Sequence, residues 1–291
     1  MNKKLVAMVT SLVVGGTVLC GTAYANASQL SGYESYKASV KDTKALKNGT
    51  ADLKVSVYDN GSDIVDMTAN AKINLPSNAM SEVTTVKSSA GNQTFSMYKQ
   101  DEKNIFKSSS SDVYNVRENK NKNVNKKDKV ENPEIAKSVE TVVDTLVGNM
   151  KNNVSVVDNN DGTKKVSINL SENDVTPLVN ALTSMAMIKS GGEPMHNGKA
   201  GEINLTNVLP QLQSNIKIKS VEVTGDINKS DILDNQVGKI VLTGTDAQGK
   251  THEITINATL DLSNINSTTP DTVDLTGKQV NTVTEKFRGR D

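Results

Sequence analysis

The chain has 291 residues, of which 35% are hydrophobic and only 3% aromatic, with 33 basic and 33 acidic side chains. This length is enough to bury one large core or two modest ones, and the core must be built mainly from Val, Ile, Leu, Ala and Met. The balanced charge argues against nucleic acid or an anionic membrane surface as a general partner.

The N-terminal residues 1–25 have the features of a secretory signal peptide: two lysines, an apolar run over 5–19 and small residues before the cleavage point. We predict cleavage after Ala25, with Ala27 as the alternative. The apolar run of about 15 residues is shorter than the roughly 20 that a membrane-spanning helix needs, so we expect no stable membrane span after cleavage. The mature protein is therefore predicted to be secreted or associated with the cell surface.

Cys20 is the one cysteine in the sequence, and it raises the alternative of a bacterial lipoprotein acylated at this residue. Leu19 is a large residue immediately before the cysteine, which is wrong for that processing. We therefore expect Cys20 to be removed with the leader, so that the mature chain contains no disulfide. The leader also removes two lysines and no acidic residue, which leaves a net charge of about −2.

Alternating apolar residues predict two groups of antiparallel strands, over 50–116 and over 216–262. The clearest unit is 237–262, in which apolar and polar residues alternate on both sides of a turn at 246–249. Asn60-Gly61 marks another hairpin turn. Between 216 and 223 the apolar residues change phase, so we expect a β-bulge near Lys219 and Ser220.

Three segments carry apolar residues at helical spacing, namely 32–47, 133–150 and 174–188. The first is expected to end at Asn48-Gly49, and the third follows a Ser-x-x-Asp capping pattern that begins at Ser171. We expect these amphipathic helices to pack on the sheet with their apolar stripes.

The segment 117–131 interrupts this order with six basic residues among asparagines and without an aromatic residue. One interpretation makes it a binding patch for teichoic acids or other anionic cell-wall polymers, and the other makes it a solvated linker. The candidate polymer-binding residues are Lys120, Lys122, Lys126, Lys127 and Lys129.

The sequence contains no recognisable catalytic or metal-binding motif. There are two histidines, His196 and His252, and Ile256 stands where a zinc-protease motif after His252 would need a second histidine. No Gly-x-Ser-x-Gly elbow, phosphate-binding loop or dinucleotide-binding fingerprint occurs. We therefore predict a protein that is not an enzyme and has no metal or cofactor, with His252 as a strand-end side chain.

These elements predict an α+β protein, with a large curved antiparallel sheet of about 8–11 strands packed against about three amphipathic helices. We divide the chain into the leader at 1–25, a helix and β-meander at 26–116, the basic linker at 117–131, helices and a second meander at 132–262, and a tail at 263–291. The second meander is expected to complete the same domain as the first, and the tail to form an irregular arm with at most one short edge strand.

The order of helix, antiparallel meander, helices and further meander behind a leader resembles the lipoprotein-carrier architecture of the LolA-like and mycobacterial LprG-like families. This resemblance is topological and covers most of 32–262; it implies a curved sheet wrapped around helices to hold acyl chains. The segments YESYK at 33–37, TKAL at 43–46 and TPDTVDLTG at 269–277 are similar to uncharacterised exported proteins of spore-forming Gram-positive bacteria. The sequence before Cys20 departs from the lipobox of Gram-positive lipoproteins, which argues against membrane tethering.

Our leading hypothesis is a non-catalytic exported protein that binds a lipid or other hydrophobic ligand between the sheet and the helices. The alternative is a cell-envelope interaction module with a filled core, which binds wall polymers or protein partners through its surface. The candidate ligand-binding residues are Val139, Val142, Val143, Leu146, Leu178, Leu182, Met185, Ile254 and Ile256.

Overall fold

The computed structural model describes residues 32–118, 148–177, 180, 183 and 208–282. Within them lie one α-helix, α3 (Gly32–Lys44), a 3-10 helix, η1 (Gly148–Asn153), and a single twelve-stranded sheet. The strands are β1 (Asn48–Asp59), β2 (Ser62–Asn74), β3 (Ala79–Ser88), β4 (Gly91–Gln100), β5 (Lys103–Ser108), β6 (Tyr114–Glu118), β7 (Val154–Asp158), β8 (Lys164–Ser171), β9 (Leu212–Ile227), β10 (Leu233–Asp246), β11 (Thr251–Ser263) and β12 (Val280–Thr282).

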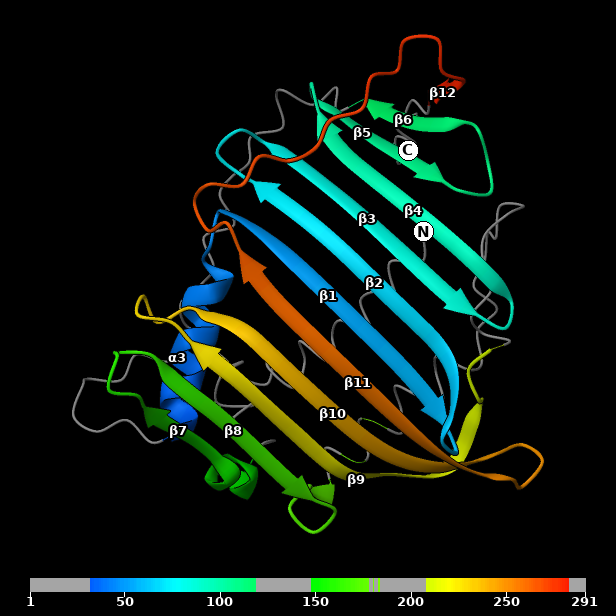
Figure 1. The fold of residues 1–291 in the computed structure, drawn as a ribbon. Coiled ribbons are helices and arrows are strands. Elements are labelled where there is room, and N and C mark those ends of the chain that lie inside the picture. Colours follow the sequence, from blue (N-terminus) through cyan, green and yellow to red (C-terminus); the bar gives the residue numbers. More distant parts are fainter. Residues whose placement is uncertain (1–31, 119–147, 178–179, 181–182, 184–207, 283–291) are drawn as a thin grey trace, which may run out of the picture.

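The strand order is β12-β6-β5-β4-β3-β2-β1-β11-β10-β9-β8-β7, with β1 and β11 side by side in the middle (Figure 1). β1 and β11 are antiparallel, and Leu53 lies opposite Leu260. β12 pairs with β6 in parallel, whereas the other neighbours pair antiparallel. Strands from both predicted meanders therefore belong to one sheet.

Two hairpin turns form where the sequence predicts them. Asn60 and Gly61 have φ of 48° and 81° between β1 and β2, as a type I′ turn requires. Between β10 and β11, Gly249 has φ of 79°, and a side-chain oxygen of Asp246 accepts hydrogen bonds from the backbone N–H groups of Gln248 and Lys250 at 2.9 and 2.8 Å. Local turn chemistry thus sets the register of both hairpins.

The predicted bulge is confirmed in β9. Val241 lies opposite Ser220 and Leu242 opposite Ile218, so Lys219 is the extra residue. Because an inserted residue reverses the alternation of side chains, the bulge keeps the apolar residues before and after it on one face of the sheet.

We call the face of the sheet on which α3 packs the inner face. Tyr33, Tyr36 and Val40 of α3 form one buried cluster with apolar residues of β8, β9 and β10. The buried Tyr36 hydroxyl lies 2.7 Å from Gln236 Nε2, which donates a hydrogen bond to it from β10. The helix therefore covers the inner face near the β7 edge.

A second cluster covers the centre of the inner face. Most of its residues alternate along β1, β2, β10 and β11, as the predicted pattern requires, and three come from β3 and β9. Burial of each large aliphatic side chain contributes about 1.5–3 kcal/mol to the hydrophobic stabilisation. The cluster consists of Leu53, Val55, Val57, Val65, Met67, Val86, Leu212, Ile216, Leu242, Ile254, Ile256 and Ala258.

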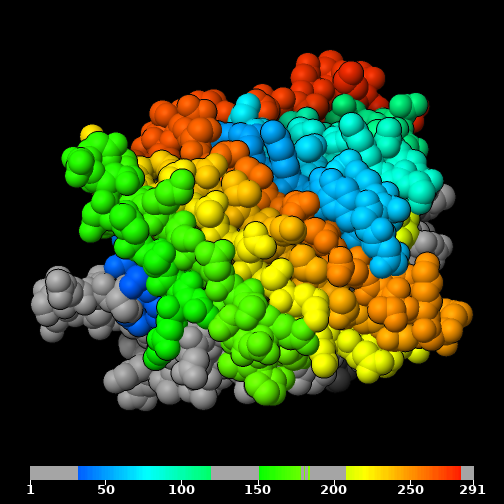
Figure 2. Space-filling view, turned by 60° about the horizontal axis from the view of Figure 1, so that its bottom comes forward, coloured from blue at the N-terminus to red at the C-terminus, as the bar shows by residue number. Residues whose placement is uncertain are grey.

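The opposite, outer face carries mostly polar side chains. In Figure 2 the green, yellow, orange and blue strands from β8 to β1 follow one another across this face. The C-terminal arm, residues 264–282, leaves β11 in the middle of the sheet, crosses the ends of β1–β4 and reaches β6 through β12 (Figure 1). On the outer face at this end, Ile105 and Val116 are only 1% and 3% exposed.

The expected α+β class, with about three helices packed on the sheet, is wrong. The described chain is dominated by the twelve-stranded sheet and has one α-helix, because the alternating strands extend further than predicted; β9 and β10 have 16 and 14 residues. The predicted helix 32–47 ends at Lys44, and Asn48-Gly49 is the start of β1 instead of a helix stop.

The other two predicted helices lie mostly outside the described residues. The end of 133–150 forms part of the 3-10 helix η1, whose Gly and Asn residues are weak α-helix formers. The capping pair before the third helix is present, since the Ser171 hydroxyl and N–H both donate to Asp174 Oδ2, at 2.6 and 2.8 Å. Beyond it, the N–H of Asn180 donates to the carbonyl of Thr176 in a helical bond of 3.1 Å.

Candidate functional site

The apolar rows of the inner face contain Ile254 and Ile256, two of the residues that the sequence predicts to bind a ligand. Ile254 and Ile256 face the same side as Val57 and Leu242 on the neighbouring strands and are 4% and 6% exposed. Along β11 the apolar inner-face row continues from Ile254 to Leu260, which spans about 20 Å at the usual rise of a strand. Except for the partly buried Leu260, these side chains are buried in the central apolar cluster of the inner face.

Small side chains lie in the middle of this surface. Ala258 of β11 pairs with Val55 on one side and with Gly238 on the other. A Cβ placed on Gly238 would come no closer than 3.8 Å to the side chain of Val223, so the backbone is not crowded there. A bulky residue at position 258 would project into this part of the inner face.

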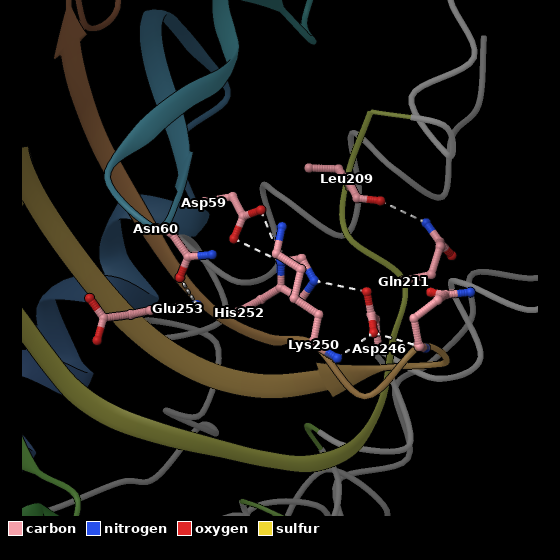
Figure 3. A network of polar contacts seen from close by, with 9 residues as sticks. Asp59, Asn60, Leu209, Gln211, Asp246, Lys250, His252 and Glu253 are labelled. Atoms are coloured by element: carbon pink, nitrogen blue, oxygen red, sulfur yellow. Dashed lines mark hydrogen bonds and ion pairs between the residues drawn. The ribbon is translucent and has the colours of Figure 1, made fainter.

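A buried polar cluster ends the apolar row at the β10–β11 turn (Figure 3). His252 Nδ1 lies 2.9 Å from both carboxylate oxygens of Asp59, and His252 Nε2 lies 3.2 Å from Oδ2 of Asp246. The side chain of His252 is 7% exposed, against 17% and 16% for the two aspartates. The hydrogen bond from His252 lowers the pKa of the Asp246 carboxyl below its ordinary value.

The contacts of this cluster are between the imidazole and the two carboxylates. Both imidazole nitrogens face carboxylates, so neither is available to a nucleophile or to a metal ion. The described residues contain no group of three or more His, Cys, Asp or Glu placed to hold a metal. What the arrangement can do is join the end of β1 to the ends of β10 and β11 by charge-assisted hydrogen bonds.

The sequence places His252 correctly at a strand end but does not reveal its partners. Asp246 belongs to the same hairpin, six residues away, and the turn register brings it close to the histidine. Asp59 is 193 residues away and arrives through the pairing of β1 with β11. The sequence signal for this contact was the acidic residue immediately before the Asn60-Gly61 turn. Acidic residues are common beside turns, so this signal does not identify a partner of His252.

The outer face has a hollow of about 420 Å³ over β8, β9, β10, β11 and β1, lined by both polar and apolar side chains. The exposed Lys54 and Lys239 line it together with Ser56, Asn257 and Glu222. Lys239 and Glu222 are direct cross-strand partners, so the positive charge of the hollow is partly balanced. The exposed Val237 also lines the hollow, which therefore offers apolar contacts beside the two lysines.

The structure tests the predicted site residues only in part. Ile254 and Ile256 lie together in the inner-face cluster. The other proposed ligand-binding residues, Val139, Val142, Val143, Leu146, Leu178, Leu182 and Met185, lie outside the described residues. The same is true of the proposed polymer-binding residues Lys120, Lys122, Lys126, Lys127 and Lys129.

No family model and no curated protein matches this sequence. Among solved structures, the chain is similar to a crystal structure of a beta-barrel-like protein of a domain of unknown function from Brucella abortus. The identity is 7%, the match covers 75% of this chain and 98% of the other, and the TM-score is 0.17. A likeness of this size carries no argument about function, so the resemblance to lipoprotein carriers stays a prediction.

None of the helical segments in the described part has the length and apolar character of a membrane-spanning helix. The export signal, the Gram-positive source and the lipid ligand remain predictions from the sequence.

Proposed function

We propose that the chain is a non-catalytic, exported binding protein that holds a hydrophobic ligand, such as a lipid acyl chain, against the inner face of its sheet. The observation that carries this proposal is the breadth of the apolar surface: its buried rows run across β1, β2, β10 and β11. The helix α3 packs on this face toward the β7 edge, against β7 and the neighbouring part of β10.

An apolar sheet face is stable only when something other than water covers it. A long apolar ligand is suited to the row of aliphatic side chains from Ile254 to Leu260, about 20 Å long, because such a row offers dispersion contacts without polar groups to desolvate. Polar side chains lie at both ends of the apolar rows of the β10–β11 hairpin. Gln236 donates a hydrogen bond to Tyr36 at one end, and His252 contacts Asp59 at the other.

The test is titration of the delipidated mature chain with a fluorescent fatty acid, comparing the wild type with Ala258→Phe and Thr259→Phe. Ala258 faces the inner side and is 3% exposed, whereas Thr259 is the next residue and faces the outer side. We expect saturable binding that Ala258→Phe weakens at least about tenfold, equivalent to about 1.4 kcal/mol, and that Thr259→Phe leaves unchanged.

Circular dichroism and urea unfolding of both variants check that each remains folded. The absence of saturable binding to the wild type would contradict the proposal, as would equal weakening by the two variants.

A second candidate function rests on the outer hollow, where Lys54 and Lys239 could bind an anionic cell-wall polymer. The experiment is sedimentation of the protein with isolated cell walls at low and high salt. Lys54→Glu combined with Lys239→Glu should abolish co-sedimentation, whereas Lys87→Glu, at an exposed position outside the hollow, should preserve it. Co-sedimentation that survives the double substitution would exclude this hollow as the binding site.

A further inference from the structure

Asp59, His252 and Asp246 meet at one end of the inner face, in a nearly closed environment. Each imidazole nitrogen lies within hydrogen-bonding distance of a different carboxylate, at 2.9 Å for Nδ1 and 3.2 Å for Nε2. Because all three side chains are largely shielded from solvent, their charges interact more strongly than surface charges do.

The two contacts cannot both be hydrogen bonds unless the imidazole carries two protons. A neutral imidazole has one N–H, so its other nitrogen presents a lone pair to a carboxylate. The cluster then changes from two negative charges with one positive charge to two uncompensated negative charges, and one attractive contact becomes repulsive.

The cluster connects two turns that are far apart in sequence. Asp59 is the last residue of β1 before the Asn60-Gly61 turn, and Asp246 is the last residue of β10. Asn60 adds two bonds across the same gap: its N–H donates to the carbonyl of Glu253, and its side-chain oxygen accepts from the N–H of Glu253, at 2.9 and 3.0 Å.

Other groups near the imidazole do not replace its charge. Gln211 Nε2, in the segment before β9, donates to the carbonyl of Leu209 at 2.9 Å, and both side chains are neutral (Figure 3). Lys250 and Glu253, the charged residues beside His252 in its own hairpin, are both exposed. Among the described residues, Asp59 and Asp246 have no ion pair other than those with His252.

We propose that Asp59, His252 and Asp246 form a proton-dependent clamp that holds the β1–β2 turn against the β10–β11 turn. The clamp is closed while the imidazole carries both protons and opens when rising pH removes one of them. Opening separates the two turns at the end of the apolar row. If the proposed ligand function also holds, the same opening speeds ligand exchange at higher pH.

The clamp is tested by pulsed electron paramagnetic resonance on the ligand-free protein, with spin labels on Ser62→Cys and Gln248→Cys. Both positions are exposed and belong to the two turns, and after removal of the leader the chain has no other cysteine. From about pH 5 to about pH 8, the range in which histidine commonly changes charge, the label-to-label distances should become longer and more broadly distributed.

Asp246→Asn is the matched control. A neutral imidazole can still donate from Nδ1 to Asp59 in this variant, and it no longer faces a second carboxylate, so the distances should not change with pH. Asp59→Asn is the second variant, with the same expectation. In His196→Gln, which leaves His252 as the single histidine, the imidazole NMR shift should change over the same pH range as the distances.

Distances that stay constant while the imidazole titrates would overturn the clamp. An equal pH response in wild type and both Asn variants would overturn it as well. Because the experiment uses ligand-free protein, its failure leaves the proposed ligand function untouched, and a failure to bind fatty acid leaves the clamp untouched.

Discussion

The side chain of Asn48 forms two hydrogen bonds with the backbone of Thr268, 220 residues away in the sequence. Asn48 Nδ2 donates to the carbonyl of Thr268 at 2.9 Å, and the N–H of Thr268 donates to Asn48 Oδ1 at 2.8 Å. Gln100 repeats the arrangement with the backbone of Val273, at 3.0 and 2.8 Å. In both places an amide side chain reproduces the paired bonds of a neighbouring strand, and this attaches the C-terminal arm to the sheet.

Substitution Gln100→Ala should release part of the arm. It removes two hydrogen bonds, each worth about 1 kcal/mol, so the free energy of unfolding should fall by about 1–2 kcal/mol. Amide hydrogen exchange at 270–276 should become faster. Asn92→Ala, at an exposed position near the other end of β4, is the control and should leave both quantities unchanged. Unaltered exchange in Gln100→Ala would show that these bonds do not hold the arm.

Substitution Ile256→Ala should lower the free energy of unfolding by about 2–5 kcal/mol, because it removes a buried side chain from the centre of the inner face. Asn257→Ala changes the next residue, which faces the outer side, and should have an effect within about 0.5 kcal/mol. Urea unfolding measures both values. Similar values for the two variants would mean that the inner face does not support the fold.

Gly225→Ala should destabilise the sheet by about 1–3 kcal/mol, because the added Cβ would come within 2.8 Å of the carbonyl oxygen of Asn235 and 3.0 Å of a Leu233 methyl group. Gly238→Ala is the matched control on the neighbouring strand, where the nearest atom to the added Cβ is 3.8 Å away. Thermal unfolding should show a lower Tm for Gly225→Ala and an unchanged Tm for Gly238→Ala. If Gly225→Ala had the Tm of the wild type, β9 and β10 would have to shift locally to make room for the added Cβ.

Acid should weaken the clamp through Asp246. Its pKa lies below the ordinary value of 3.8 in the folded protein, so the stabilisation is present above that value and is lost as the pH falls through the lower folded pKa. Urea midpoints measured between about pH 5 and about pH 2 should fall in wild type and fall less in Asp246→Asn. Equal slopes for the two proteins would contradict a folded-state interaction at this carboxyl.

Local signals in the sequence predict much of the sheet. The Asn60-Gly61 turn, the hairpin at 237–262 and the bulge at Lys219 are confirmed, because turn residues and alternation fix short-range register. The pairing of β1 with β11 joins residues about 200 positions apart, and no local pattern encodes it.

The contacts of the C-terminal arm and of the clamp could not be predicted from local sequence patterns. Ile105 and Val116 are buried on the face that alternation assigns to the outside, at the end of the sheet that the irregular arm crosses. His252 acquires its roles from two aspartates on different hairpins. The predicted α+β class is wrong because apolar periodicity identifies amphipathic segments but does not determine how much of the chain belongs to a sheet.

The central claim, a hydrophobic ligand on the inner face, is tested most directly by native mass spectrometry of the mature chain purified from an exporting bacterial host. We expect a mass above that of the polypeptide, an extra component released by organic solvent, and the loss of this component in Ala258→Phe but not in Thr259→Phe. The claim would be contradicted if the wild type had the mass of the polypeptide alone and released no component, and if Ala258→Phe were folded and equally without ligand.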